Sequence, residues 1–204
     1  MSTLINQPEE YFTGLIPSRD ELLLELEAEA KRENIPIVGP VVGELLYILA
    51  VAARAASILE IGTATGYSAI YLARACAPVN GRVVTLENND ALADRARQNF
   101  QKAGLGGRVE IRVADALETL KQLDDEFDLI FIDIGKKDYI KALPDCRRLL
   151  GKGGLLVADN VAFKDADAFN RAIADHPDWR SVSLLSYLPL HSPEHDALCL
   201  ALRL

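Results

Sequence analysis

The sequence contains few cysteines and no cluster of positive charge. Its three cysteines, Cys76, Cys146 and Cys199, are odd in number and far apart, so they match no metal-binding or redox spacing. We interpret them as small buried hydrophobic residues of a protein in a reduced compartment. The 22 lysines and arginines are outnumbered by 30 acidic residues, which gives a formal net charge of −8. Because no basic run stands out, we expect no nucleic-acid partner.

Long hydrophobic runs are also missing. The apolar stretch at residues 45–56 is too short to span a bilayer and contains Arg54. The N-terminus has neither the basic segment nor the long apolar core of a signal peptide. We therefore expect a cytoplasmic protein that does not associate with membranes.

The composition is that of a globular protein. Half of the 204 residues are hydrophobic and a quarter are charged, which suits one domain with a sizeable core. No internal repeat or low-complexity segment is present. We predict a single domain over residues 1–204, with a helical N-terminal extension at 1–56 and the core at 57–204.

Two helices are predicted in the N-terminal extension, after an arm or short helix at residues 1–17. Ser18 and Glu21 have the spacing of a capping box, so a helix should begin with Ser18 as its N-cap. It should run to about Asn34, because Pro36 follows. A second, heavily apolar helix is expected at about 40–56.

From residue 58 the chain alternates between strand and helix patterns. The predicted strands are 58–61, 83–87, 108–113, 128–132, 154–158, 181–189 and 197–203. The predicted helices are 67–77, 89–104, 116–123, 137–150 and 165–175. Five strand–helix units predict an α/β fold with a Rossmann-like, doubly wound, mostly parallel sheet. The last two strands have no helix between them, so they should form a hairpin that makes the final strand of the seven-stranded sheet antiparallel.

The first strand is followed by a turn with glycines at positions 62 and 66 and then by a helix. A strand, a glycine turn and a helix in this order bind nucleotide-like cofactors in open α/β sheets. Ala64 breaks the glycine spacing of the dinucleotide fingerprint, which disfavours a dinucleotide-dependent oxidoreductase. Glu60 places a carboxylate before the turn, and an acid there suits a cationic ligand better than a pyrophosphate.

At this turn the sequence resembles the class I S-adenosylmethionine (SAM) methyltransferases. The run Glu60-Ile61-Gly62-Thr63-Ala64-Thr65-Gly66-Tyr67-Ser68-Ala69 is similar to the cation-dependent O-methyltransferases that act on catechol and caffeoyl-CoA. The resemblance implies a SAM cofactor, a small phenolic acceptor and a homodimer. It also implies the antiparallel last strand.

Several residues are predicted to bind the cofactor. Glu87 ends the second strand, where an acid accepts hydrogen bonds from ribose hydroxyls in related folds. Asp115 and Ala116 fall where the family contacts adenine, although Asp115 could instead cap the following helix. Val38 resembles an element that covers the methionine end of the cofactor. The complete predicted set is Val38, Glu60, Gly62, Thr63, Gly66, Tyr67, Ser68, Glu87, Asp115, Ala116 and Asp133.

A second group of polar residues follows the fourth and fifth strands. Asp133 ends one strand, and Asp159 and Asn160 end the next, so their side chains should share one crevice. Two carboxylates and an amide suit Mg²⁺, Mn²⁺ or Ca²⁺, whereas the alternative is that they are helix N-caps. The resemblance implies that Asp133, Asp159 and Asn160 hold the divalent cation. It also implies that Lys136 is the catalytic lysine, acting with Asp133.

Two departures from the family pattern concern the acceptor. Gly135 stands where relatives have a larger residue, and the connection at 161–164 is short, which removes a wall from the acceptor pocket. The hairpin loop at 190–196 is longer than a tight turn needs. Its Glu194, His195 or His191 could hydrogen-bond an acceptor hydroxyl, and the alternative is a solvated polar turn.

We therefore predict a divalent-cation-dependent SAM O-methyltransferase that acts on a hydroxyl of a small phenolic, catechol-like acceptor. Two alternatives remain: a metal-independent methyltransferase of the same fold that acts on another acceptor, and a non-catalytic binding or dimerisation partner.

Overall fold

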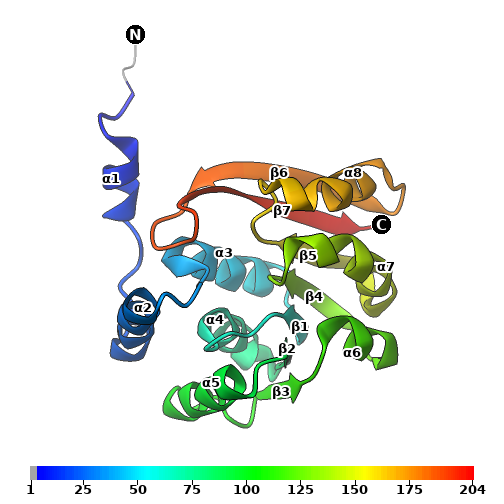
Figure 1. Cartoon of the computed structure of the whole chain (residues 1–204), viewed down its shortest axis with the longest axis horizontal. Coiled ribbons are helices and arrows are strands. Elements are labelled where there is room, and N and C mark those ends of the chain that lie inside the picture. The colour runs from blue at the N-terminus through cyan, green and yellow to red at the C-terminus, as the bar shows by residue number, and fades with distance from the viewer. Residues whose placement is uncertain (1–3) are drawn as a thin grey trace.

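The computed structural model describes residues 4–204, and a seven-stranded sheet forms its centre (Figure 1). The strand order is β3-β2-β1-β4-β5-β7-β6. β7 is antiparallel to β5 and to β6, whereas the pairs among β1 to β5 are parallel. The predicted mostly parallel sheet with an antiparallel last strand is therefore confirmed. The strands are β1 (Ser57–Ile61), β2 (Arg82–Glu87), β3 (Val109–Val113), β4 (Phe127–Ile132), β5 (Leu150–Ala158), β6 (Trp179–Tyr187) and β7 (His195–Arg203).

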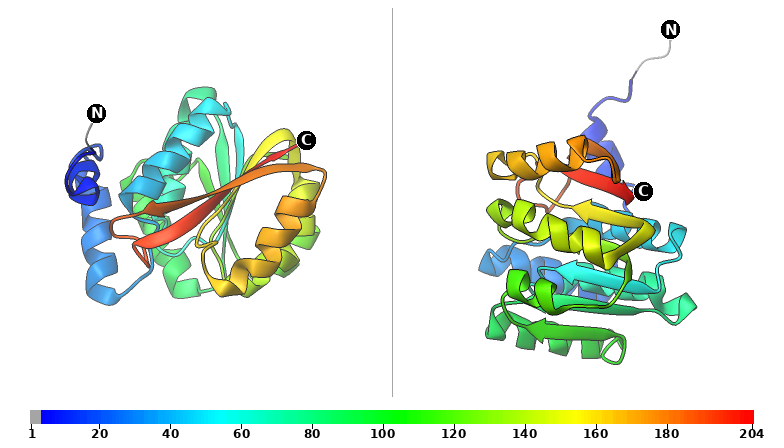
Figure 2. Two further views of the ribbon diagram at one scale, coloured as in Figure 1. Left: turned by 90° about the horizontal axis from the view of Figure 1, so that it is seen from above. Right: turned by 90° about the vertical axis from the view of Figure 1, so that its right-hand side faces the viewer.

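Helices cover both faces of the sheet (Figure 2). Successive residues of a strand point to opposite faces, so Ile58 joins the core beneath α3, α4 and α5, and Leu59 joins the core beneath α6, α7 and α8. The central strands are buried on both faces, which explains their continuous apolar sequences. The helices are α1 (Pro8–Thr13), α2 (Glu21–Glu33), α3 (Gly39–Ala52), α4 (Tyr67–Cys76), α5 (Asp90–Lys102), α6 (Ala116–Gln122), α7 (Tyr139–Leu149) and α8 (Asp167–Asp175).

The ends of the N-terminal helices differ from the prediction. The N-cap of α2 is Asp20, whose carboxylate accepts a hydrogen bond from the backbone N–H of Leu23 at 3.0 Å. Ser18 is not the cap, because Asp20 is also a good capping residue and lies directly before the helix. The helix α3 ends at Ala52, before residue 56, because Arg54 adopts a left-handed conformation with φ of 52°.

Three strands begin two or more residues earlier than predicted. β5 starts at Leu150, which pairs with Phe127 across an irregularity in the register, and the glycines that follow Leu150 concealed this extension in the sequence. β6 and β7 each start two residues early, so the segment between them is 188–194. All three cysteines are free and buried, as expected. Within residues 4–204, no helix combines the length and apolar character needed to cross a membrane.

Candidate active site

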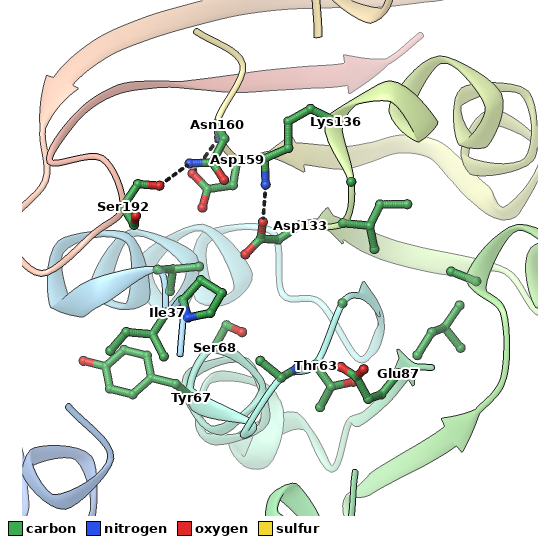
Figure 3. A pocket seen from close by; sticks show the side chains of 18 of the residues that line it. Ile37, Thr63, Tyr67, Ser68, Glu87, Asp133, Lys136, Asp159, Asn160 and Ser192 are labelled. Carbon is green, nitrogen blue, oxygen red and sulfur yellow. Dashed lines mark hydrogen bonds and ion pairs between the residues drawn. The ribbon is translucent and has the colours of Figure 1, made fainter. Parts of the chain in front are cut away.

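A cavity of about 370 Å³ opens at the carboxyl ends of the central strands. The order of the parallel strands reverses between β1 and β4, because the chain builds outward from β1 to β3 and then continues from β4 on the other side. Open α/β sheets bind their ligands at this switch point. Figure 3 shows side chains from several elements directed toward this space.

The turn between β1 and α4 forms one wall of the cavity. Gly62 has a φ of 105°, and a Cβ atom there would lie 2.0 Å from the carbonyl oxygen of Asp133. Gly66 has a φ of 88°, and a Cβ atom there would lie 2.5 Å from the Phe100 ring. Only glycine permits these approaches, which draw the turn against the end of β4 and against α5. The residues of the turn and of α4 that line the cavity are Gly62, Thr63, Ala64, Tyr67 and Ser68.

Glu87 ends β2 and lines the cavity. Its Oε2 accepts a hydrogen bond from the backbone N–H of Ala64 at 2.8 Å, and its Oε1 accepts from those of Asn88 and Asn89 at 3.0 and 2.9 Å. These three donors hold the carboxylate in one orientation at the cavity wall (Figure 3). An acid fixed in this way suits the ribose hydroxyls of a nucleoside.

Glu60 does not line the cavity but lies fully buried beside it. Its Oε2 accepts a hydrogen bond from Thr85, whereas its Oε1 has no partner among the described residues. Burial raises the pKa of Glu60 to about 8, and the neighbouring hydroxyl groups of Ser68 and Thr85 act in the opposite direction. Glu60 is therefore covered in this structure, and its contact with the cofactor stays a prediction.

Of the residues predicted to contact the adenine or the methionine part of the cofactor, two line the cavity and one does not. Val38 and Ala116 line the cavity, together with Ile37. Asp115 does not, because its exposed carboxylate accepts a hydrogen bond from the backbone N–H of Glu118 at 2.9 Å and caps α6. Of the two roles weighed for Asp115, the structure supports the capping role.

A buried polar chain anchors α2 to the cavity wall. The hydroxyl of Tyr67 donates to Glu27 Oε1 at 2.6 Å, and Arg19 binds both oxygens of the same carboxylate at 2.9 and 3.1 Å. Glu27 and Arg19 could not be identified from the sequence, because each occupies a position where a solvated charge is the ordinary expectation. Their contact with Tyr67 ties the N-terminal extension to the turn of the site.

Asp133 and Lys136 form an ion pair at the opposite end of the cavity. Lys136 Nζ lies 2.9 Å from Asp133 Oδ1, and both residues line the cavity, as predicted. Burial and then the negative charge of Asp159 raise the pKa of Asp133, while Lys136 acts in the opposite direction. Two carboxylates therefore share this end of the site, with one lysine beside the first of them (Figure 3).

Asp159 and Asn160 follow β5 and line the same part of the cavity. The carboxylate of Asp159 accepts a hydrogen bond from the backbone N–H of Asn160 at 2.8 Å. The amide of Asn160 donates to Asp196 Oδ2 at 2.6 Å, and Asn160 has a left-handed φ of 51°. Tyr139 donates to the carbonyl oxygen of Asp159 at 3.0 Å from α7. These contacts hold Asp159 and Asn160 in place at the end of β5, and neither residue is the N-cap of the helix that follows.

His191 is the member of the hairpin loop that enters the cavity. Its Nε2 lies 2.9 Å from each carboxylate oxygen of Asp159, and its side chain is only 1% exposed. Burial lowers the pKa of His191, but the hydrogen bond to Asp159 and the charge of that carboxylate outweigh burial, so the pKa is raised. The loop length indicated that residues 190–196 reach the site but could not identify His191 as the residue in contact.

The other loop candidates lie outside the cavity. His195 faces Glu9 at 3.5 Å, and Glu194 Oε1 accepts from the backbone N–H of Leu190 at 3.3 Å. The predicted role of Glu194 or His195 at the acceptor is therefore not supported, whereas His191 and Ser192 line the cavity. Phe163 lines it as well, so the short connection still supplies one wall.

The side chains at the Asp133 and Asp159 end of the cavity are of the kinds that bind divalent cations. Asp133 and Asp159 repel each other in a partly buried space, which a cation would relieve. Among residues 4–204, no three His, Cys, Asp or Glu side chains converge as a metal-binding cluster. The amide of Asn160 is therefore needed in a ligand set with the two carboxylates.

Comparison with known proteins is consistent with this site. The family model described as O-methyltransferase matches residues 17–176. A catechol O-methyltransferase of Niastella koreensis is 40% identical over 157 residues, which cover 74% of this chain and 71% of that protein. The structure of an O-methyltransferase from Bacillus cereus in complex with SAH has a TM-score of 0.87 and 31% identity, covering 97% of each chain. The O-methyltransferase TomG of Streptomyces achromogenes, in complex with SAM, has a TM-score of 0.86 and 32% identity, covering 97% of this chain and 96% of TomG.

The sheet topology and the switch-point cavity define a Rossmann-like methyltransferase fold. The chain belongs to the O-methyltransferase family, and it is a SAM-dependent enzyme. This assignment removes the dinucleotide-dependent oxidoreductase and the non-catalytic partner from consideration. The oriented carboxylate of Glu87 and the close backbone approach at Gly62 fit a nucleoside-type cofactor such as SAM.

Proposed function

We propose that this enzyme methylates one hydroxyl of a small phenolic acceptor with adjacent hydroxyls, at a divalent cation held by Asp133, Asp159 and Asn160. The observation that carries the proposal is that one cavity contains both Glu87, suited to the cofactor, and the two carboxylates after β4 and β5. The name of the Niastella koreensis relative, a catechol O-methyltransferase, also supports a catechol-like acceptor.

Residues at one end of the cavity would bind the cofactor, and residues at the other end would act on the acceptor. Glu87 and the turn around Gly62 would hold the cofactor. Lys136, as a neutral amine, would take the proton of the acceptor hydroxyl and become an ammonium paired with Asp133, because its Nζ lies beside that carboxylate and the residue lines the cavity. When bound, the cation would lower the pKa of the acceptor hydroxyls and orient them. Placing acceptor and cofactor side by side supplies the proximity that the transfer needs.

Apolar residues limit the water in the cavity. Ile37 and Val38 line it before α3, Ile134 lines it after β4, and Phe163 lines it after β5. Opposite charges of a phenolate and a sulfonium cancel as the methyl group moves, so a site with little water favours the reaction. These walls also restrict the acceptor to a small, flat molecule in a cavity of about 370 Å³.

An acceptor panel tests this proposal. Purified enzyme would be incubated with SAM, Mg²⁺ or Mn²⁺, and either catechol, phenol or the monomethyl ether of catechol. We expect methylation of catechol and at least about tenfold lower kcat/KM for the other two, because only catechol offers two adjacent oxygens to the cation. Equal rates with phenol would favour the metal-independent methyltransferase. No product from any of the three would show that the acceptor class is wrong.

A further inference from the structure

A buried charge pair lies behind one wall of the cavity. Glu27 of α2 is only 8% exposed, although the other buried residues of this helix are apolar. Arg19, from the segment before α2, donates to both oxygens of the Glu27 carboxylate at 2.9 and 3.1 Å. Replacing a buried ion pair by apolar residues of similar volume is often neutral or stabilising. The carboxylate is therefore better explained by a role other than packing.

The same carboxylate holds a residue of the cavity wall. Tyr67 begins α4 and lines the cavity, and its hydroxyl donates to Glu27 Oε1 at 2.6 Å. Figure 3 shows this hydroxyl at the end of the ring that points away from Asp133. Hydrogen bonds to a carboxylate are shorter and stronger than those between neutral groups. Glu27 therefore fixes the Tyr67 ring from behind, without lining the cavity itself.

Apolar packing alone does not set the position of this ring. Tyr67 belongs to one core cluster with Leu23 of α2 and with Val38, which lies between α2 and α3. Figure 3 shows Ile37, which also lines the cavity, on the same side as Tyr67. Burial of apolar surface is not directional, so it does not by itself select one orientation of the ring. The hydrogen bond to Glu27 selects that orientation where α2 and α4 meet.

We infer that Glu27, held by Arg19, is a positioning residue for the SAM cofactor: it fixes the Tyr67 ring so that this wall of the cavity is formed before the cofactor binds. When only a fraction of the molecules has the wall formed, the affinity for the ligand falls by that fraction. If the ring without its hydrogen bond occupied the observed position about a tenth of the time, the Kd would rise about tenfold.

Calorimetric titration of the full chain with SAH, in the presence of a chelator, tests the role of Glu27. Tyr67→Phe, which removes only the hydroxyl, and Glu27→Leu, which removes its acceptor, should each raise the Kd by about tenfold. Glu27→Gln should stay within about threefold of the wild type, because its amide oxygen still accepts from the Tyr67 hydroxyl. The double variant Tyr67→Phe with Glu27→Leu should resemble the single variants, because both changes break the same hydrogen bond. The titration uses neither the acceptor nor the cation proposed above, so its outcome does not depend on either.

Arg95→Met is the matched control. Arg95 of α5 pairs with Glu29 and Glu33 of α2, so it also holds α2 to the body of the protein, but it does not line the cavity. Its Kd for SAH should stay within about twofold of the wild-type value even if its Tm falls. An effect as large as that of Tyr67→Phe would overturn the inference, because docking of α2 in general would then determine the affinity.

The variants of Glu27 and Tyr67 can also contradict the inference. An unchanged Kd in Tyr67→Phe would show that the hydrogen bond does not shape the site, and this result decides the matter even if Glu27→Leu does not fold. A Kd in Glu27→Gln as high as in Glu27→Leu would show that the charge, rather than the hydrogen bond to Tyr67, is what matters. Effects that multiply in the double variant would show that Glu27 and Tyr67 act separately.

Discussion

Two glutamates at the ends of adjacent strands differ in role because their surroundings differ. Glu87 accepts three backbone hydrogen bonds and lines the cavity, whereas Glu60 is fully buried with one oxygen unpartnered among the described residues. Their positions at strand ends predicted cofactor contact for both. The sequence could not reveal which carboxylate would be covered, because that depends on how the turn folds over β1 and β2.

The buried carboxyl of Glu60 should make stability depend on pH. Its pKa is about 8 in the folded protein and 4.5 when unperturbed, so the folded state keeps the proton after the unfolded state has lost it. The stabilisation is therefore complete below pH 4.5 and is lost as pH rises toward 8, by roughly 1.4 kcal/mol per pH unit. We expect Glu60→Gln to remove this slope, because glutamine does not ionise.

Urea denaturation of the cofactor-free protein from pH 5 to 8 measures the effect. The informative quantity is the difference in unfolding free energy between the wild type and Glu60→Gln, since the other titrating groups are shared. This difference should change steadily with pH in favour of the variant. A constant difference across the range would mean that Glu60 ionises normally in the folded protein.

At the scale of elements, local sequence predicted the strand, the turn and the helix that form one wall of the cavity. The apolar run of β1, the glycines at 62 and 66 and the start of α4 are signals contained in a few neighbouring residues. The acids after β4 and β5 could also be placed together, because parallel strands end at one edge of the sheet.

The side-chain contacts of the hairpin loop could not be predicted in the same detail. His191 reaches Asp159 because the loop packs on Gly39 and Asn160, which are distant in the sequence. Side-chain directions in a loop follow from such contacts rather than from periodicity. The choice of Asp20 over Ser18 as a helix cap was ambiguous for a related reason, since both residue types cap helices well.

At the scale of the whole molecule, the N-terminal elements expose an apolar surface. Figure 1 shows α1 projecting beyond the body of the sheet. An apolar groove of about 360 Å³ lies between the α1 segment and α3, with Phe12, Leu15 and Ile48 among its lining residues. These three side chains are 59 to 60% exposed. Apolar surfaces of this kind commonly mark interfaces between proteins.

We therefore expect a homodimer that uses this surface, with a second copy of the chain as the partner. Light scattering at tens of micromolar, on the order of ordinary assay concentrations, should give twice the chain mass of 22.3 kDa. The double variant Phe12→Glu with Ile48→Glu should become monomeric, because it places charge in the groove. Val79→Glu, a change at an exposed apolar residue of another segment, should remain dimeric. A monomeric wild type would contradict the expectation.

The central claim is that methyl transfer depends on a cation held by the acids after β4 and β5. Its most direct test is the rate of methyl transfer from SAM to catechol before chelation, after exhaustive chelation and after Mn²⁺ is returned, for the wild type and for Asp159→Ala. The wild type should lose its activity on chelation and regain it with Mn²⁺. Asp159→Ala should stay inactive while its Kd for SAM stays within about threefold of the wild-type value. A wild-type rate that is unchanged by exhaustive chelation would contradict the account.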